Sequence, residues 1–218
     1  MRELPAGDDA VIFDYSADTD PPAAAALAAA VLRAAASAGE LMLSDVVPTA
    51  DAVLVQAPPG AGLDLGGVRR ILARAQRPAG GITAGPQVQI PVVYDGADLD
   101  EAAGCVGLTA AELVSAHTTI VWRVQFMGFA PGFGYLVPVG GPPAARAAFG
   151  ALTRRRQSRP AVPPGAVAAA AGYSAVYPSA SPGGWFLLGR TDIGLWDVEA
   201  QPPALLAAGA TVRFQCAD

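Results

Sequence analysis

The sequence predicts an α+β protein with a small N-terminal α/β domain over residues 1–87 and a β-rich domain, a barrel or a sandwich, over residues 88–218. Two observations lead to this prediction. The first third of the chain alternates short apolar runs with two helical segments. The later part is interrupted by glycine or proline every few residues, with short apolar runs between them. A length of 218 residues is enough for two domains that each bury a core.

The order of elements in the N-terminal domain is predicted as strand, helix, strand, strand, helix. Asp20 before Pro21 and Pro22 marks the start of the first helix, which an alanine-rich stretch continues until Gly39. Pro78 ends the second helix. We expect strands at 10–15, 41–48 and 51–56 and helices at 23–38 and 64–76, with both helices on one face of the sheet.

The C-terminal domain is expected to begin after residues 79–86, which predict a linker or an irregular hairpin. Residues 90–96 (IPVVYDG) predict a strand that runs into a turn. Two short helices should follow at 98–103 and 109–116, and the second opens with a capping box formed by Thr109 and Glu112. After His117 the pattern predicts strands and loops.

Composition and charge exclude several classes of function. The net charge is −5 and the pI is about 4.8, whereas a nucleic-acid-binding protein normally carries a basic stripe. The chain has no lysine, so Schiff-base chemistry and a P-loop lysine are excluded. The motif G-x-S-x-G of serine hydrolases is also missing.

Metal, membrane and secretion signals are also missing from the sequence. Cys105, Cys216 and His117 are three widely spaced candidates, too few for a structural zinc site, and the two cysteines form no disulfide framework. No run of about 20 apolar residues predicts a membrane span, and the first residues do not resemble a signal peptide. We therefore expect a cytoplasmic protein.

A glycine- and aromatic-rich segment at 128–135 (GFAPGFGY) is the first candidate site. Gly128 and Gly132 let the backbone approach a ligand, Pro131 fixes a turn, and Phe129 and Tyr135 offer flat walls. These five residues are predicted to bind substrate. A tight, well-packed loop without a ligand would produce the same pattern.

A second candidate site combines the turn Pro182-Gly183-Gly184 with Trp185, all predicted to bind substrate, and with Arg190 at the end of the strand that follows. A guanidinium there can bind a carboxylate or phosphate with two hydrogen bonds. A hairpin with a surface arginine explains the same residues.

Basic residues and one histidine complete the set of candidates. The run Arg154, Arg155, Arg156 and Arg159 can hold an anion, although most charge runs are simply solvated. His117 is the only histidine, which makes it the candidate proton shuttle. Its place at the end of a predicted helix also fits a histidine stabilised by the helix dipole.

Five ordered motifs together resemble one family, that of the B-type 5-oxoprolinase component, also called allophanate hydrolase subunit 1 or carboxyltransferase subdomain C/D. Residues 117–136 resemble its pattern G-F-x-P-G-F-x-Y-L preceded by a histidine. The other matching segments are 90–103 (IPVVYDGADLDEAA), 159–165 (RPAVPPG), 177–191 (YPSASPGGW and LGRT) and 209–214 (GATVRF).

The resemblance implies a cyclophilin-like barrel for the C-terminal domain. It implies an ATP-dependent conversion of 5-oxoproline to glutamate, with ATP and Mg shared with a partner, the C-type component, which resembles carboxyltransferase subdomain A/B. A LamB-type third component would complete ring opening. His117, Arg159 and Arg190 would be the catalytic residues, and Tyr177 joins the predicted substrate-binding residues. No nucleic-acid partner is expected.

One departure from the family pattern concerns the substrate. A Gln-Thr-Gly triplet is common in the family, and this chain has Tyr173-Ser174-Ala175 instead. A glutamine amide can pair with a lactam or urea group through both a donor and an acceptor, which tyrosine cannot do. Alternatives are therefore a non-catalytic regulator such as a histidine-kinase inhibitor and a urea- or allophanate-type carboxyltransferase component. The expected barrel alone suggests a further alternative, a peptidyl-prolyl isomerase.

Overall fold

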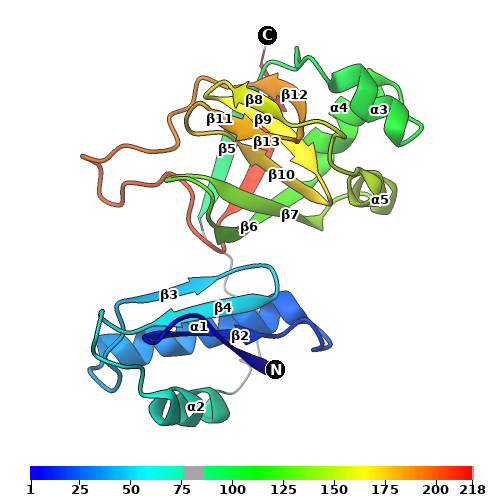
Figure 1. Ribbon diagram of the computed structural model, residues 1–218. Coiled ribbons are helices and arrows are strands. Elements are labelled where there is room, and N and C mark those ends of the chain that lie inside the picture. The colour runs from blue at the N-terminus through cyan, green and yellow to red at the C-terminus, as the bar shows by residue number, and fades with distance from the viewer. Residues whose placement is uncertain (76–85, 218) are drawn as a thin grey trace. The chain divides into compact units, whose positions relative to one another are not determined.

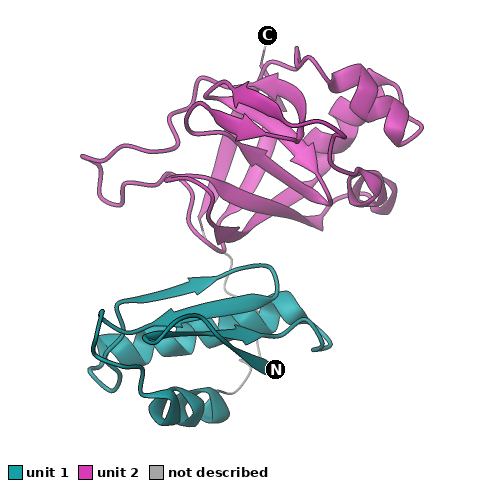
Figure 2. Ribbon diagram, in the orientation of Figure 1, with its two compact units in different colours: residues 1–82 teal, residues 83–218 magenta. Residues whose placement is uncertain are grey.

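The computed structural model describes residues 1–75 and 86–217, so the predicted linker at 79–86 lies, apart from Pro86, outside the described residues. The chain divides into two compact units, Met1–Ile82 and Thr83–Asp218 (Figure 2). The division lies between residues 82 and 83, whereas the change in sequence character predicts one near residue 87. Each unit surrounds an apolar core of its own.

Unit 1 is an antiparallel sheet with helices packed on one face (Figure 1). Its strands lie in the order β1-β2-β4-β3. Alternate residues of the two central strands, among them Phe13 and Val53, are buried against Leu32 and Val68 of the helices. The elements are β1 (Arg2–Pro5), β2 (Ala10–Asp14), α1 (Pro21–Ser37), β3 (Asp45–Pro48), β4 (Ala52–Gln56) and α2 (Leu65–Arg74).

Helix α1 begins and ends where the sequence predicts. The Asp20 carboxylate accepts a hydrogen bond of 3.2 Å from the backbone N–H of Ala23, and Pro21 occupies the first turn. Gly39, with φ of 75°, follows the last turn. The side chains that α1 buries are four alanines and one leucine, so the helix lies close to the sheet.

Unit 2 is a nearly closed barrel. Seven strands form one sheet in the order β12-β9-β10-β7-β6-β13-β5, and β11 pairs with β8 beside it. Val93, after β5, and Arg190 of β12 exchange two backbone hydrogen bonds of 2.9 Å, which join the two edges of the sheet. The strands are β5 (Gln87–Val92), β6 (Val121–Met127), β7 (Gly134–Gly140), β8 (Arg159–Val162), β9 (Ala166–Ala170), β10 (Tyr173–Val176), β11 (Ser181–Gly183), β12 (Phe186–Arg190) and β13 (Thr211–Cys216).

Three helices of unit 2 contribute to its main core: α3 (Leu99–Cys105), α4 (Ala110–Thr119) and α5 (Pro143–Ala151). The capping box predicted for α4 is present. Thr109 Oγ1 accepts from the Glu112 N–H, and the Glu112 carboxylate accepts from the Thr109 N–H at 2.8 Å.

Two elements were not expected from the sequence. Strand β1 is an edge strand with little buried surface, so it has no clear apolar alternation. Helix α5 lies in the part after His117 for which only strands and loops are predicted, and its Pro143 occupies the first turn, which a helix tolerates. Strand β3 begins at Asp45, later than predicted. The predicted fold class, a small α/β unit followed by a barrel, is confirmed.

Candidate functional site

Aromatic side chains of unit 2 gather on the face of the β7-β10-β9-β12 strands that points away from the main core. Strand alternation explains the arrangement, because Val167 and Ala169 belong to the main core while Ala168 and Ala170 belong to this second cluster. Neighbouring rings pack with centroids between 4.3 and 6.3 Å apart. The aromatic cluster consists of Phe126, Phe129, Phe133, Tyr135, Tyr173, Tyr177 and Trp185.

The predicted loop Gly128–Phe133 forms one edge of this cluster. Its ends are joined by a hydrogen bond from the Gly128 N–H to the Phe133 carbonyl. Phe129 has φ of 71° and Gly132 has φ of 81°. A positive φ is strained for phenylalanine, yet 59% of the Phe129 surface is exposed. The loop therefore holds a strained aromatic residue toward solvent, while Pro131 is exposed beside it.

The Gly183-Gly184 turn requires glycine for space. A Cβ on Gly183 would lie 2.4 Å from Tyr177 Oη, and a Cβ on Gly184 would lie 2.9 Å from Ser158 Oγ. Both distances are shorter than real Cβ contacts. The Arg155 N–H donates a 2.9 Å hydrogen bond to the Gly184 carbonyl, so the turn is joined to the arginine-rich segment, residues 154–159. Pro182 is exposed.

Arg155 and Arg159 are bound to a carboxylate that the sequence did not single out. Asp98 is 2% exposed, and its Oδ1 lies 2.5 Å from Arg159 Nη2 and 3.4 Å from Arg155 Nε. Its Oδ2 accepts a 2.8 Å hydrogen bond from the Leu187 N–H. Asp98 stands at the N-cap of α3 but does not cap it, and instead connects the arginine-rich segment to β12. Arg159 Nη1 is buried and has no acceptor among the described residues.

Arg190 lies apart from this arrangement. Its Nε is 2.9 Å from the Asp95 carboxylate in an exposed ion pair. Arg159 and Arg190, both predicted to be catalytic, are therefore each paired with a different aspartate.

Arg154 is exposed and has no ion pair among the described residues. Burial raises the pKa of Tyr135 above its ordinary value, and the Arg154 cation partly offsets this shift. Burial likewise raises the pKa of Tyr177, with Tyr135 adding to the shift and Arg154 and Arg159 opposing it. Arg154 and Arg159 therefore partly offset the effect of burial on the pKa of these two phenols.

His117 has no exposed surface. Its Nδ1 lies 2.7 Å from Tyr94 Oη and its Nε2 lies 2.8 Å from Ser174 Oγ, so both ring nitrogens are hydrogen-bonded. The ring stacks on Phe214 with centroids 4.3 Å apart. Burial lowers the pKa of His117 to about 3, so the ring is neutral at pH 7. This geometry favours a structural role, and the proton shuttle stays a prediction.

Gln125 is a further polar residue that the sequence did not single out. The Tyr173 hydroxyl donates a 3.0 Å hydrogen bond to Gln125 Oε1. Tyr173 itself stacks on Trp185. This hydrogen bond uses the side-chain carbonyl oxygen of Gln125. The two N–H donors of the same amide have no partner among the described residues.

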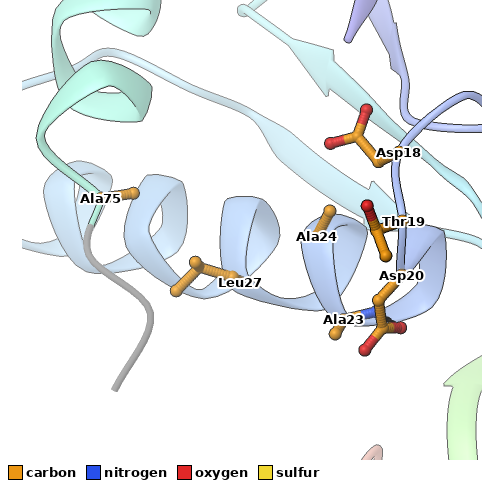
Figure 3. Close-up of a pocket in the computed structure, with 7 residues that line it drawn as sticks. All are labelled: Asp18, Thr19, Asp20, Ala23, Ala24, Leu27 and Ala75. Carbon is orange, nitrogen blue, oxygen red and sulfur yellow. Dashed lines mark hydrogen bonds between the residues drawn. The ribbon is translucent and has the colours of Figure 1, made fainter. Parts of the chain in front are cut away.

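A hollow lies in unit 1 beside α1 and contains none of the predicted site residues. Figure 3 shows the Asp18 and Asp20 carboxylates at one end of it and Leu27 between them and Ala75. Asp18 pairs with the N-terminal amine, and Asp20 caps α1. The remaining lining residues are Thr19, Ala23 and Ala24, so this hollow offers little for specific recognition.

Neither a metal site nor a membrane-spanning helix occurs over residues 1–75 and 86–217. No three His, Cys, Asp or Glu side chains come together there as a metal site. No helix in the same ranges has the length and apolar character needed to cross a bilayer.

Comparison with known proteins identifies the family. The family model described as carboxyltransferase domain, subdomain C and D, matches residues 1–206. A relative from Bacillus subtilis (strain 168), the B component of its 5-oxoprolinase, is 40% identical over 130 residues, which cover 58% of this chain and 51% of the relative. The chain thus spans about half the length of that curated relative.

Two solved structures share the fold. TTHA0988 is 33% identical with a TM-score of 0.75, and the match covers 96% of this chain but 40% of that one. The urea carboxylase of Kluyveromyces lactis has a TM-score of 0.76 at 16% identity, with 99% of this chain and 22% of that chain covered. On the family match over nearly its whole length, the chain belongs to the carboxyltransferase domain, subdomain C and D, family.

Proposed function

We propose that this chain is one component of an ATP-dependent 5-oxoprolinase-type amide hydrolase, which converts 5-oxoproline to glutamate together with a C-type partner. The observation that carries the proposal is the position of the arginine-rich segment against the aromatic cluster of unit 2. The similarity to the B component of the Bacillus subtilis 5-oxoprolinase supports it.

The chemistry of 5-oxoproline matches these groups. The molecule is a nearly flat lactam ring that bears one carboxylate. Aromatic faces fit such a ring, and a guanidinium fits the carboxylate. Arg155 and Arg159 already share Asp98. Of the exposed arginines Arg154 and Arg156, we assign the substrate carboxylate to Arg154, because it opposes the raised pKa values of Tyr135 and Tyr177 in the aromatic cluster.

The lactam amide requires a hydrogen-bond donor for its carbonyl oxygen. Gln125 can provide one, because Tyr173 occupies its oxygen and fixes its amide. In this arrangement, Tyr173 replaces the glutamine common in the family without removing a side-chain amide from the site. Hydrogen bonds fixed before the reaction cost no reorganisation when charge develops on the carbonyl oxygen.

The described residues of this chain offer groups for the phosphates of ATP but not for its metal ion. Arginines can bind phosphate groups, but the described residues gather no metal-binding cluster for Mg²⁺. We therefore assign the nucleotide and its metal to the complex with the C-type partner.

The test is an assay of the chain purified in complex with a C-type partner and supplied with the LamB-type third component that completes ring opening. Wild-type complex should form glutamate from 5-oxoproline only when ATP is present. Arg154→Gln should raise KM for 5-oxoproline by roughly 10- to 100-fold, the loss of one charge-assisted hydrogen bond. Arg146→Gln, an equally exposed change on α5, should leave KM unchanged. A complex of confirmed composition that forms no glutamate would refute the proposal.

A non-catalytic regulator is the second candidate, and the burial of His117 favours it. A histidine with no exposed surface and two occupied nitrogens does not reach a substrate in this conformation. Autophosphorylation of a histidine kinase from the same organism, measured with and without the chain, separates the candidates. Inhibition by a chain whose complex lacks hydrolase activity would establish the regulator. The likeness to urea carboxylase, at 16% identity, concerns the fold alone.

A further inference from the structure

An ordered arm projects from the barrel of unit 2 between β12 and β13 (Figure 1). We define the arm as residues 195–206. Its two ends, Leu195 and Leu206, are buried in the main core. The Leu205 N–H donates to the Leu195 carbonyl at 3.0 Å, and the Asp197 N–H donates to the Pro203 carbonyl at 2.9 Å. These bonds give the arm a defined hairpin-like shape.

The arm exposes large apolar side chains. Trp196 is 44% exposed, Val198 is 71% exposed and Leu205 is 42% exposed. Exposed apolar groups that are held in place by a buried base are typical of binding surfaces, and tryptophan is enriched among residues that dominate binding energy. The hydrogen bonds between the two sides of the arm join backbone atoms, so they do not depend on these three side chains.

The arm adjoins the loop of the aromatic cluster. A Cβ on Gly132 would lie 2.9 Å from the Leu195 carbonyl oxygen and 3.1 Å from Trp196 Cβ. The loop that carries the exposed, strained Phe129 therefore packs directly against the start of the arm. A molecule bound to the arm would lie beside the candidate site.

Charge restricts what can bind there. From Thr191 to Val212 the chain contains Asp192, Asp197 and Glu199 but no arginine or lysine, and all three acidic residues are exposed. Complementary potentials guide association, whereas like charges placed together oppose it. Two copies of this chain paired arm to arm would bring these acidic groups together. The arm fits a different protein whose surface has an apolar hollow bordered by cations.

We propose that the arm is the docking surface for the partner protein of the complex, so that its binding covers the aromatic cluster. The identity of this protein as the C-type partner rests on the proposed function. The length of TTHA0988 is consistent with a polypeptide partner, because 60% of that solved chain lies beyond the part this chain matches (100% minus the 40% covered). Covering the site would exclude water from it and strengthen its electrostatic interactions.

The test measures affinity of the full chain for the C-type partner of the same organism by isothermal titration calorimetry. The double variant Trp196→Ser/Val198→Ser should raise Kd on the order of 100-fold, as expected for central interface residues. The control Val139→Ser, an exposed valine on β7 outside the arm, should not change Kd. Far-UV circular dichroism and the melting temperature verify that both variants fold.

The outcomes separate the two proposals. A wild-type chain that forms no complex overturns the partner in the proposed function and with it the docking surface. A complex that the double variant forms with unchanged Kd overturns the arm alone. A wild-type dimer that the double variant converts to a monomer, measured by light scattering, would show that a second copy occupies the arm and would also overturn the proposal.

Discussion

All the buried polar or charged side chains that the structure describes lie in unit 2, namely Asp98, His117, Ser174 and Thr191, whereas the described core of unit 1 is apolar. A buried polar group costs free energy unless hydrogen bonds compensate it. Asp98 and His117 are both compensated by specific partners. The buried core of unit 1 is thus held by apolar packing, with its hydrogen bonds and ion pairs at the periphery, whereas unit 2 also buries a polar network next to its candidate site.

The aromatic residues follow the same division. All three tryptophans, Trp122, Trp185 and Trp196, belong to unit 2. Tryptophan fluorescence therefore reports the unfolding of unit 2 in the full chain. The helical signal of far-UV circular dichroism includes α1, the longest helix described, with 17 residues. Because α3, α4 and α5 of unit 2 contribute to the same helical signal, the part of the circular dichroism change that has no accompanying fluorescence change reports unit 1.

Removing the Asp98 carboxylate should have the largest effect. Asp98→Ala leaves Arg155 and Arg159 without their buried partner, which should lower the free energy of unfolding of unit 2 by about 3 to 5 kcal/mol. Urea unfolding followed by tryptophan fluorescence measures this change. Asp95→Ala removes an exposed ion pair and should cost less than about 1 kcal/mol.

Equal losses for Asp98→Ala and Asp95→Ala would contradict the special role of the buried carboxylate. If Asp98→Ala does not fold, Asp98→Asn provides the second measurement. Its amide oxygen can still accept from the Leu187 N–H, so it should fold and lose less stability than the alanine variant.

A cavity in the apolar core of unit 1 should have the next largest effect. Leu32→Ala removes a fully buried side chain and should destabilise unit 1 by about 2 to 5 kcal/mol. The part of the circular dichroism transition that belongs to unit 1 should shift while the tryptophan transition does not. Leu27→Ala, the same change at a partly exposed position of α1, should cost less. A parallel shift of both transitions would show that the two units do not unfold separately.

Local sequence patterns predicted much of the fold. Asp20 with Pro21 predicted the start of α1, and Thr109 with Glu112 predicted the capping box of α4, because both signals depend on neighbours within four residues. The sequence also predicted a tight turn at the glycine-aromatic loop, because Gly132, which adopts a positive φ, follows directly after Pro131.

The arrangement of charged groups was not predictable in this way. Arg159 binds Asp98, which is 61 residues away in the sequence, and Asp98 looks like an ordinary helix cap. The sequence places His117 at the end of a predicted helix. Its buried environment, however, is formed by Ser174, 57 residues later, and by Phe214. Pairings of this kind are set by the tertiary fold, so a single sequence does not reveal which arginine remains free for a ligand.

The buried histidine makes the stability of unit 2 depend on pH. The pKa of His117 is lowered to about 3 in the folded chain, whereas it is near 6.5 in the unfolded chain. Between these values the unfolded state binds the extra proton, so stability is complete above pH 6.5 and falls as the pH is lowered. Unit 2 should lose about 2 kcal/mol between pH 7 and pH 5, at about 1.4 kcal/mol per pH unit below 6.5.

Urea unfolding followed by tryptophan fluorescence at pH 7, 6 and 5 measures this loss. His117→Gln should be less stable at pH 7 but should no longer lose stability over this range, because His117 is the only histidine. Since carboxylates titrate mainly below pH 5, they contribute little to the comparison. A variant with the same pH dependence as the wild type would show that another group is responsible.

The smallest expected effect concerns the N-terminus of α2 in unit 1. The Asp64 carboxylate accepts a 2.8 Å hydrogen bond from the Gly67 N–H, and Arg70 Nη2 lies 3.8 Å from it in an exposed pair. Asp64→Ala should cost unit 1 about 1 kcal/mol, the usual value of an N-cap, measured by circular dichroism in urea. Asp64→Asn keeps the acceptor but removes the charge, so it should cost no more than a few tenths of a kcal/mol. If the asparagine variant lost as much as the alanine variant, the ion pair rather than the cap would stabilise α2. The stability of unit 1 would then depend on an ion pair at its surface as well as on the packing of its apolar core.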